Sequence, residues 1–143
     1  MELNRRHAWD ETPREAIALQ QVLRHEVVVD APFDLARMGL VAGVDVSVKR
    51  GISRAAVVVA AFPTFEIIET VTAERPTPFP YVPGLLSFRE GPVLEEAFER
   101  LVHVPDVFVF DGAGIAHPRR IGIAAHMGLW LERPTIGCAK TRL

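Results

Sequence analysis

The fold of this 143-residue chain is decided by the stretch Asp106-Val-Phe-Val-Phe-Asp111-Gly-Ala-Gly114-Ile-Ala-His117-Pro-Arg-Arg120. Four consecutive apolar residues between two aspartates predict a central buried strand. Two glycines, a histidine and two arginines follow immediately. A strand that delivers a carboxylate to its C-terminal end, beside flexible backbone and positive charge, is the arrangement that metal-dependent phosphodiester chemistry requires.

The segments around this strand predict an α/β fold. Thr12-Pro13-Arg14-Glu15 forms a capping box that begins a helix ending near residue 25, and the side expected to be buried holds Ala16, Leu19, Val22 and Leu23. Strands are expected at about 40–48, 55–62 and 66–73, with links short enough for an antiparallel meander. A helix to about 101, the strand 106–111, a helix at 119–131 and a strand at 134–139 follow. This order is the ribonuclease H-like one, with helices flanking a mixed sheet, in a single domain spanning 1–143.

The composition excludes several classes of protein. Apolar residues make up 49% of the chain, which is enough for a packed core and too much for a disordered chain. No apolar stretch is long enough to span a bilayer, and the N-terminus lacks a signal-peptide core, so no membrane partner is expected. The single cysteine, Cys138, allows no intramolecular disulfide and is expected to be buried. A reducing cytoplasm is the natural location.

The charge is distributed unevenly. The net charge of −2 by itself argues against a nucleic-acid binder, but residues 112–143 carry +4 while residues 1–111 carry −6. The positive segment follows the strand that ends at Asp111, where a phosphate would dock if the acids hold metal. An ordinary solvated helix end is the alternative interpretation.

Three acids on otherwise apolar elements are candidates for metal ligands. Asp45 shares a strand face with Gly43 and Ser47, two small residues that leave room beside it. Glu90 lies on the inward side of its helix, near Pro92, which either kinks the helix or begins its regular part. Asp111 ends the apolar strand. Ionised carboxylates there are costly unless paired or bound to a cation, and hard oxygen ligands suit Mg²⁺, with Mn²⁺ as a substitute. Alternatively, each acid caps a turn or pairs with an arginine.

The proline-rich loop at 75–84 contains a candidate for contact with bases. In Pro80-Tyr81-Val82-Pro83 the prolines restrict the tyrosine. A rigid aromatic tip of this kind can enter a base stack or support an extruded base. An ordinary, partly buried loop tyrosine is the alternative.

Glycines and cations supply further candidates. Gly84, Gly112 and Gly114 would let a ligand approach the backbone, so that main-chain groups could read a flipped base, although tight turns also use glycine. The dinucleotide-binding pattern fails because His117 replaces its third glycine. His117 is a candidate for contact with a phosphate, a metal-bound water or a base, or for an ordinary polar contact. Lys140 ends a strand that is expected beside the Asp111 strand, near a scissile phosphate, unless it is a surface lysine.

Three blocks of the sequence resemble the endonuclease V family. They are Ala42–Val46, Pro80–Glu90, and Asp111–Gly114 with His117–Arg119. The resemblance extends from about Leu40 to the end of the chain. It implies cleavage of DNA or RNA at the second phosphodiester bond on the 3′ side of deoxyinosine or inosine, in repair of deaminated bases.

The resemblance also implies a role for each matching residue. Asp45, Glu90 and Asp111 correspond to the Mg²⁺ carboxylates. The strand-separating wedge corresponds to Pro80, Tyr81, Val82 and Pro83. The hypoxanthine pocket corresponds to Gly84, Leu86, Gly112 and Gly114. His117 and Lys140 correspond to contacts on the metal side and to phosphate.

One departure from the family pattern affects these expectations. Family members usually continue well past the segment that ends at Leu143. The chain is therefore expected to be C-terminally short, to expose a sheet edge that favours self-association or lower stability, and to be weakened or inactive as an enzyme. Two alternatives remain open: a module that binds inosine-containing nucleic acid without cutting it, and another ribonuclease H-like nuclease acting on branched or mismatched substrates.

Overall fold

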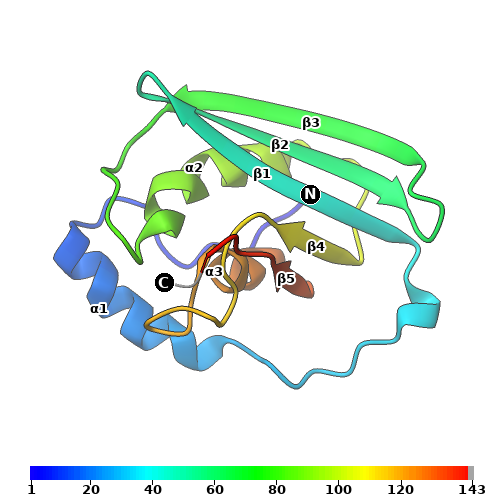
Figure 1. Ribbon diagram of the computed structural model, residues 1–143, viewed down its shortest axis with the longest axis horizontal. Helices are drawn as coiled ribbons and strands as arrows, with labels where there is room; N and C mark the ends of the chain where they lie inside the picture. Colours follow the sequence, from blue (N-terminus) through cyan, green and yellow to red (C-terminus); the bar gives the residue numbers. More distant parts are fainter. Residues whose placement is uncertain (142–143) are drawn as a thin grey trace.

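A five-stranded mixed sheet with the order β3-β2-β1-β4-β5 organises the computed structural model, which describes residues 1–141 (Figure 1). The strands are β1 (Leu40–Lys49), β2 (Ile52–Ala61), β3 (Ile67–Pro76), β4 (Val107–Phe110) and β5 (Thr135–Gly137). The first three form an antiparallel meander, whereas β4 pairs parallel with β1 and β5 pairs parallel with β4. The α/β, ribonuclease H-like order predicted from the sequence is confirmed.

The helices are α1 (Pro13–Leu23), α2 (Leu86–Glu99) and α3 (Ile123–Leu131), with short 3₁₀ turns at Arg24–Glu26 and Leu35–Arg37. In Figure 1, α2 and α3 lie behind the sheet and α1 lies to one side of it. Both α2 and α3 contact the sheet, and they also contact each other. They therefore supply the cover for one sheet face.

Alternation along β1 separates a packed face from an open one. Ala42 and Val44 are buried, whereas Gly43 and Asp45 between and after them are exposed. The packed face joins the helices in one core that includes Val57, Val59, Phe98, Phe108, Phe110, Met127 and Trp130. Asp45 therefore points away from the core, as its strand position predicts.

The prediction that Cys138 is buried is wrong. Cys138 is exposed, directly after the edge strand β5. It helps to line a hollow on the open face with Gly43, Asp45, Ala56, Val58 and Val109, where no helix among residues 1–141 provides cover. The apolar character of a cysteine does not bury it where no element of the described chain packs over its strand end.

The buried side of α1 differs from the predicted one. Val22 is 64% exposed, and Gln20 is fully buried with Ala16 and Leu23. The true stripe follows the spacing i, i+4 and i+7 from Ala16. Hydrophobicity alone selects Val22 over Gln20, but the Gln20 amide is satisfied by hydrogen bonds to Gly84 and Arg119.

Two helix boundaries depend on local backbone chemistry. Helix α2 begins at Leu86 and continues through Pro92, so the regular helix does not start at the proline. Helix α3 begins at Ile123 rather than at Arg119 as predicted. Arg120 has a left-handed φ of 58°, and the N–H of Arg119 donates to His117 Nδ1 at 3.0 Å. These features keep 118–122 in a loop.

Within residues 1–141, no helix is both long and apolar enough to cross a membrane. Arg142, which contributes to the predicted positive segment, and the end of the predicted domain at Leu143 lie outside the described residues.

The capping box of α1 provides a test of the helix that carries Gln20. Thr12 Oγ1 accepts from the Glu15 N–H, and Glu15 Oε1 accepts from the Thr12 N–H. Thr12→Ala is expected to lower the free energy of unfolding by about 1 kcal/mol in urea titration. Thr12→Ser, which keeps the oxygen, is the control and should lose much less. Equal losses would contradict a contribution from the cap.

Candidate functional site

The parallel pairing of β1 and β4 brings two of the three predicted acids side by side. Val44 lies opposite Phe110, and the Asp111 N–H donates to the Val44 carbonyl at 3.1 Å. Asp111 thus lies next to Asp45 at the following register position. Both residues line the hollow on the open face of the sheet.

Glu90 reaches the same region from α2. Burial, the main cause, raises the pKa of its carboxyl to about 7. The negative charge of Asp45 raises the pKa further, the Arg89 guanidinium opposes this, and Asp111 adds a smaller increase. The three acids therefore share one region of negative potential, which a divalent cation would relieve.

The described residues nevertheless contain no ready coordination sphere. In residues 1–141, no three or more His, Cys, Asp or Glu side chains are arranged to hold a metal ion. Asp111 Oδ2 lies 3.1 Å from Lys140 Nζ, and Asp45 Oδ1 accepts from the Val46 N–H at 2.9 Å. The donors have the hard oxygen chemistry of a Mg²⁺ or Mn²⁺ site, but Asp111 would have to exchange Lys140 for the ion. The metal assignment stays a prediction.

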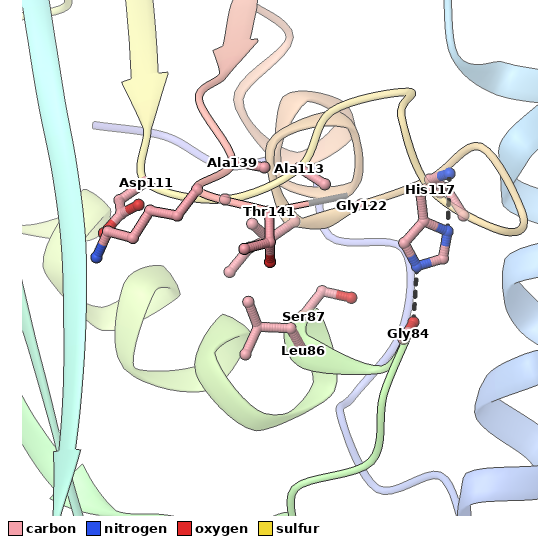
Figure 2. Close-up of a pocket in the computed structure, with 13 residues that line it drawn as sticks. Gly84, Leu86, Ser87, Asp111, Ala113, His117, Gly122, Ala139 and Thr141 are labelled. Carbon is pink, nitrogen blue, oxygen red and sulfur yellow. Dashed lines mark hydrogen bonds and ion pairs between the residues drawn. The ribbon is translucent and has the colours of Figure 1, made fainter. Parts of the chain in front are cut away.

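A cavity of about 160 Å³ opens beside Asp111, which also lines the hollow on the open face. A cavity of roughly 150 Å³ is large enough to admit a single aromatic ring. Figure 2 shows Leu86 and Ser87 on α2 at one side of this cavity, with Ala139 and Thr141 opposite. The structure thus combines a ring-sized cavity with one of the predicted acids.

Three of the four residues predicted for this pocket line it. They are Gly84, Leu86 and Gly112. A Cβ at Gly112 would lie 2.5 Å from Ile123 Cγ2, so any side chain there would require Ile123 to shift. Gly114 lies outside the lining residues, and its carbonyl accepts from the Gly122 N–H at 2.8 Å. Gly114 holds the adjacent turn, while Gly112 forms the wall itself.

The carbonyl of Gly84 is held by three side chains. It accepts hydrogen bonds from Gln20 Nε2 at 2.9 Å, His117 Nε2 at 2.8 Å and Arg119 Nη2 at 3.2 Å. Gly84 has a φ of +84°, and an added Cβ would lie 2.7 Å from Arg119 Nη2. These contacts fasten the loop before α2 to α1 and to the loop before α3.

His117 uses both ring nitrogens inside this network. Its Nε2–H donates to Gly84 (Figure 2), and its Nδ1 accepts from the Arg119 N–H at 3.0 Å. Burial is the main reason that the pKa of His117 is lowered; the Gly84 hydrogen bond opposes this, and Arg119 adds to it. The structure places His117 in the cavity wall, and its contact with a metal-bound water or phosphate stays a prediction.

The loop predicted to form a wedge presents Tyr81 to solvent. Tyr81 is 67% exposed, and the Arg89 guanidinium lies 5.9 Å from its ring centroid. Pro80 and Pro83 are also exposed, whereas Val82 packs against a small apolar cluster that includes Phe79 and Leu85. The loop is thus anchored at Val82 and projects an aromatic tip.

Lys140 lies beside Asp111, as its predicted strand placement requires. β5 pairs with β4, and the chain beyond β5 brings Lys140 to the rim of the cavity. Its side chain is 83% exposed apart from the contact with Asp111. An ammonium group is therefore available at the point where the cavity meets the acids.

Sequence reasoning missed several lining residues. These are Ser87, Ala113, Ile121, Gly122, Ile123, Ala139 and Thr141. The i, i+4 and i+7 spacing of Ala16, Gln20 and Leu23 is the pattern that could have identified Gln20 as a buried residue of α1. Ser87 carries no comparable signal, because its partner His126 is 39 residues away in the sequence.

Comparison with known proteins gives a consistent result. The family model described as Endonuclease V matches residues 21–143. Endonuclease V of Nostoc punctiforme is 49% identical over 145 residues, which cover 100% of this chain and 65% of the relative. The chain thus spans slightly less than two thirds of that protein's length.

Two crystal structures share the fold. Endonuclease V of Bacillus subtilis superposes with a TM-score of 0.93 at 33% identity, covering 100% of this chain and 62% of the other. Endonuclease V of Ciona intestinalis, in complex with a 24mer DNA containing an inosine followed by a ribo-adenosine, has a TM-score of 0.84 at 29% identity. That match covers 91% of this chain and 58% of the Ciona chain.

The raised pKa of Glu90 predicts how stability depends on pH. With its raised pKa, folded Glu90 keeps its proton up to about pH 7, while the unfolded carboxyl loses it near its ordinary pKa of 4.5. The native state binds more protons in this window, so the contribution of Glu90 to stability falls as pH rises through it. Glu90→Gln, measured in EDTA, should be roughly 3 kcal/mol more stable than the wild type at pH 8 and equal to it at pH 4.

The control for this experiment is Glu66→Gln, which changes an exposed carboxyl. Its urea titrations should follow the wild-type pH profile. A Glu90→Gln variant with the wild-type profile would show that Glu90 is not buried as described.

Proposed function

The chain belongs to the endonuclease V family, and we propose that it cleaves DNA or RNA at the second phosphodiester bond 3′ to deoxyinosine or inosine. The observation that carries this proposal is the position of Asp111, which lines both the ring-sized cavity and the hollow that holds Asp45. A base held in the cavity would keep its own strand beside the acids. Damage recognition and hydrolysis would then be coupled by geometry.

Each part of the site has a role in this proposal. The cavity, with Gly84 and Gly112 in its wall, would receive a base extruded from the helix. Lys140 would contact a backbone phosphate near Asp111. Tyr81 would enter the space that the base vacates. The DNA named in the Ciona structure supports inosine as the ligand.

Asp45, Glu90 and Asp111 would hold the proposed Mg²⁺, with Mn²⁺ as a substitute. A bound divalent ion would supply charge neutralisation and an activated water at the scissile phosphate. The chain's own contribution is to keep the three carboxyl groups in one region, where burial first, and then the charges of Asp45 and Asp111, raise the pKa of Glu90.

A second candidate function is binding without cleavage. It is favoured by the contrast between a formed cavity and the lack of a ready metal-binding group in residues 1–141. Selective binding of an inosine-containing strand with no scission in Mg²⁺ or Mn²⁺ would establish it. The predicted weak activity, the self-association through a sheet edge and the cytoplasmic location stay predictions.

Cleavage of a labelled strand with one deoxyinosine tests the main proposal. The wild type in Mg²⁺ should cut at the second phosphodiester on the 3′ side, and EDTA should stop it. Asp45→Asn should lower the rate by at least about 100-fold, since it removes a charged ligand with little change in shape. Asp30→Asn, a change at an exposed aspartate, is the control and should cut at the wild-type rate. Equal rates for the two variants would rule out Asp45 as a ligand.

Tyr81→Ala tests the wedge by comparing duplex and single-stranded substrates. A wedge compensates for unstacking in a duplex, where the loss of the ring should lower cleavage about tenfold. On a single strand, which has little stacking to disrupt, the variant should cut nearly as fast as the wild type. Equal losses on the two substrates would assign Tyr81 to ordinary contact with the strand.

A further inference from the structure

Ser87 connects the cavity to a buried chain of histidines. It lies in the first turn of α2, lines the cavity and is 2% exposed. Its Oγ is 2.7 Å from His126 Nδ1, and His126 Nε2 is 2.9 Å from His7 Nε2. His126 is fully buried in α3. A line of hydrogen bonds therefore extends from the N-terminal segment to the cavity.

The donor-to-acceptor direction of this series of hydrogen bonds follows from one main-chain donor. The Trp9 N–H donates to His7 Nδ1 at 3.3 Å, so that nitrogen carries a lone pair and the His7 proton is on Nε2. His7 Nε2–H then donates to His126 Nε2, which leaves the His126 proton on Nδ1. That proton is donated to Ser87 Oγ. The Ser87 hydroxyl proton takes no part in this series of hydrogen bonds, so the hydroxyl can donate it to a ligand in the cavity.

Other observations agree with this direction. Burial is the main reason that the pKa values of His126 and His7 are lowered, to about 3 and about 4, so both rings are neutral at pH 7 and each carries one proton. Glu11 Oε1 lies 3.3 Å from His7 Nδ1, and burial raises the pKa of Glu11. The raised pKa weakens the pairing of this carboxyl with a proton on Nδ1, so the Trp9 N–H is the donor at that nitrogen. In residues 1–141, the one hydrogen-bond partner of Ser87 Oγ is His126.

We propose that Ser87 is a specificity-determining residue that donates a hydrogen bond to the 6-oxo group of the base in the cavity. The inference rests on the proposed function. Adenine and hypoxanthine differ at this position, because adenine presents an amino donor where a 6-oxopurine presents an acceptor. A serine locked as a donor binds the oxo group and opposes the amino group. The hydrogen bonds from His7 through His126 thereby set the preference for a 6-oxopurine over adenine.

The mechanism does not require Ser87 to react. The hydroxyl acts as a fixed dipole, and His126 is a positioning residue that prevents the hydroxyl from turning inward to donate. Sites built to bond a polar group discriminate strongly against ligands that cannot complete the bond, because a buried donor is then left unpaired.

A double-mutant cycle between Ser87 and the base measures this interaction. Binding of wild type and Ser87→Ala is compared by fluorescence anisotropy, in Ca²⁺, on three strands carrying hypoxanthine, adenine or purine, which has hydrogen at position 6. Ser87→Ala should weaken binding of the hypoxanthine strand about tenfold and of the purine strand less than about twofold. Ser87→Thr, which keeps the hydroxyl, should restore binding. Equal losses on hypoxanthine and purine would assign Ser87 to packing and overturn the proposal.

A second measurement needs no nucleic acid. The ¹⁵N chemical shifts of His126 should show a protonated Nδ1 and a bare Nε2, and the reverse pattern would overturn the proposal. The same measurements distinguish failure of the proposed function from failure of the Ser87 proposal. A wild type with no preference for hypoxanthine over adenine would contradict both the proposed function and the role of Ser87. A wild type with that preference and equal losses in Ser87→Ala would overturn the role of Ser87 alone.

Discussion

The parallel pairing of β4 with β1 is the constraint on which the site depends. It places Asp111 beside Asp45 although 65 residues separate them in the chain. Because β4 ends there, the loop that leaves it forms the cavity wall at Gly112 and Ala113. β5 pairs on the far side of β4 and brings Lys140 to Asp111. The position of β4 thus determines where the two aspartates, the cavity wall and the Lys140 ammonium group lie.

The second requirement is a rigid cavity wall, and α1 provides it from outside the sheet. Gln20 and Arg119 interact with each other and with the Gly84 carbonyl, so an element near the N-terminus holds the loop that leads into α2. The N-terminal segment adds a second connection through His7 and His126. Preorganisation of this kind suits a pocket that must reject a base differing by one polar group.

The sequence predicted what depends on local pattern and missed what depends on distant partners. The β1 alternation placed Asp45 on the open face because strand periodicity needs no tertiary information. Val22 was assigned to the core, and Gln20 was not, because the hydrogen bonds that satisfy a buried amide come from residues 84 and 119. The predicted start of α3 is wrong because His117 Nδ1 accepts from the Arg119 N–H and Arg120 has a left-handed φ, which together keep this segment in a loop. The role inferred for Ser87 depends on His126, which only the tertiary fold brings beside it.

Counting charges along the chain also fails to locate the groups that could bind phosphate. The positive segment after Asp111 suggests a basic docking surface, yet Arg119 is half-buried and bonded to Gln20 and Gly84. Arg89 lies over the Tyr81 ring, and Lys140 pairs with Asp111. Phosphate contacts contribute affinity without sequence information. With Arg119 and Arg89 engaged in the protein, we expect selectivity to come from the cavity and from the donors and acceptors that line it.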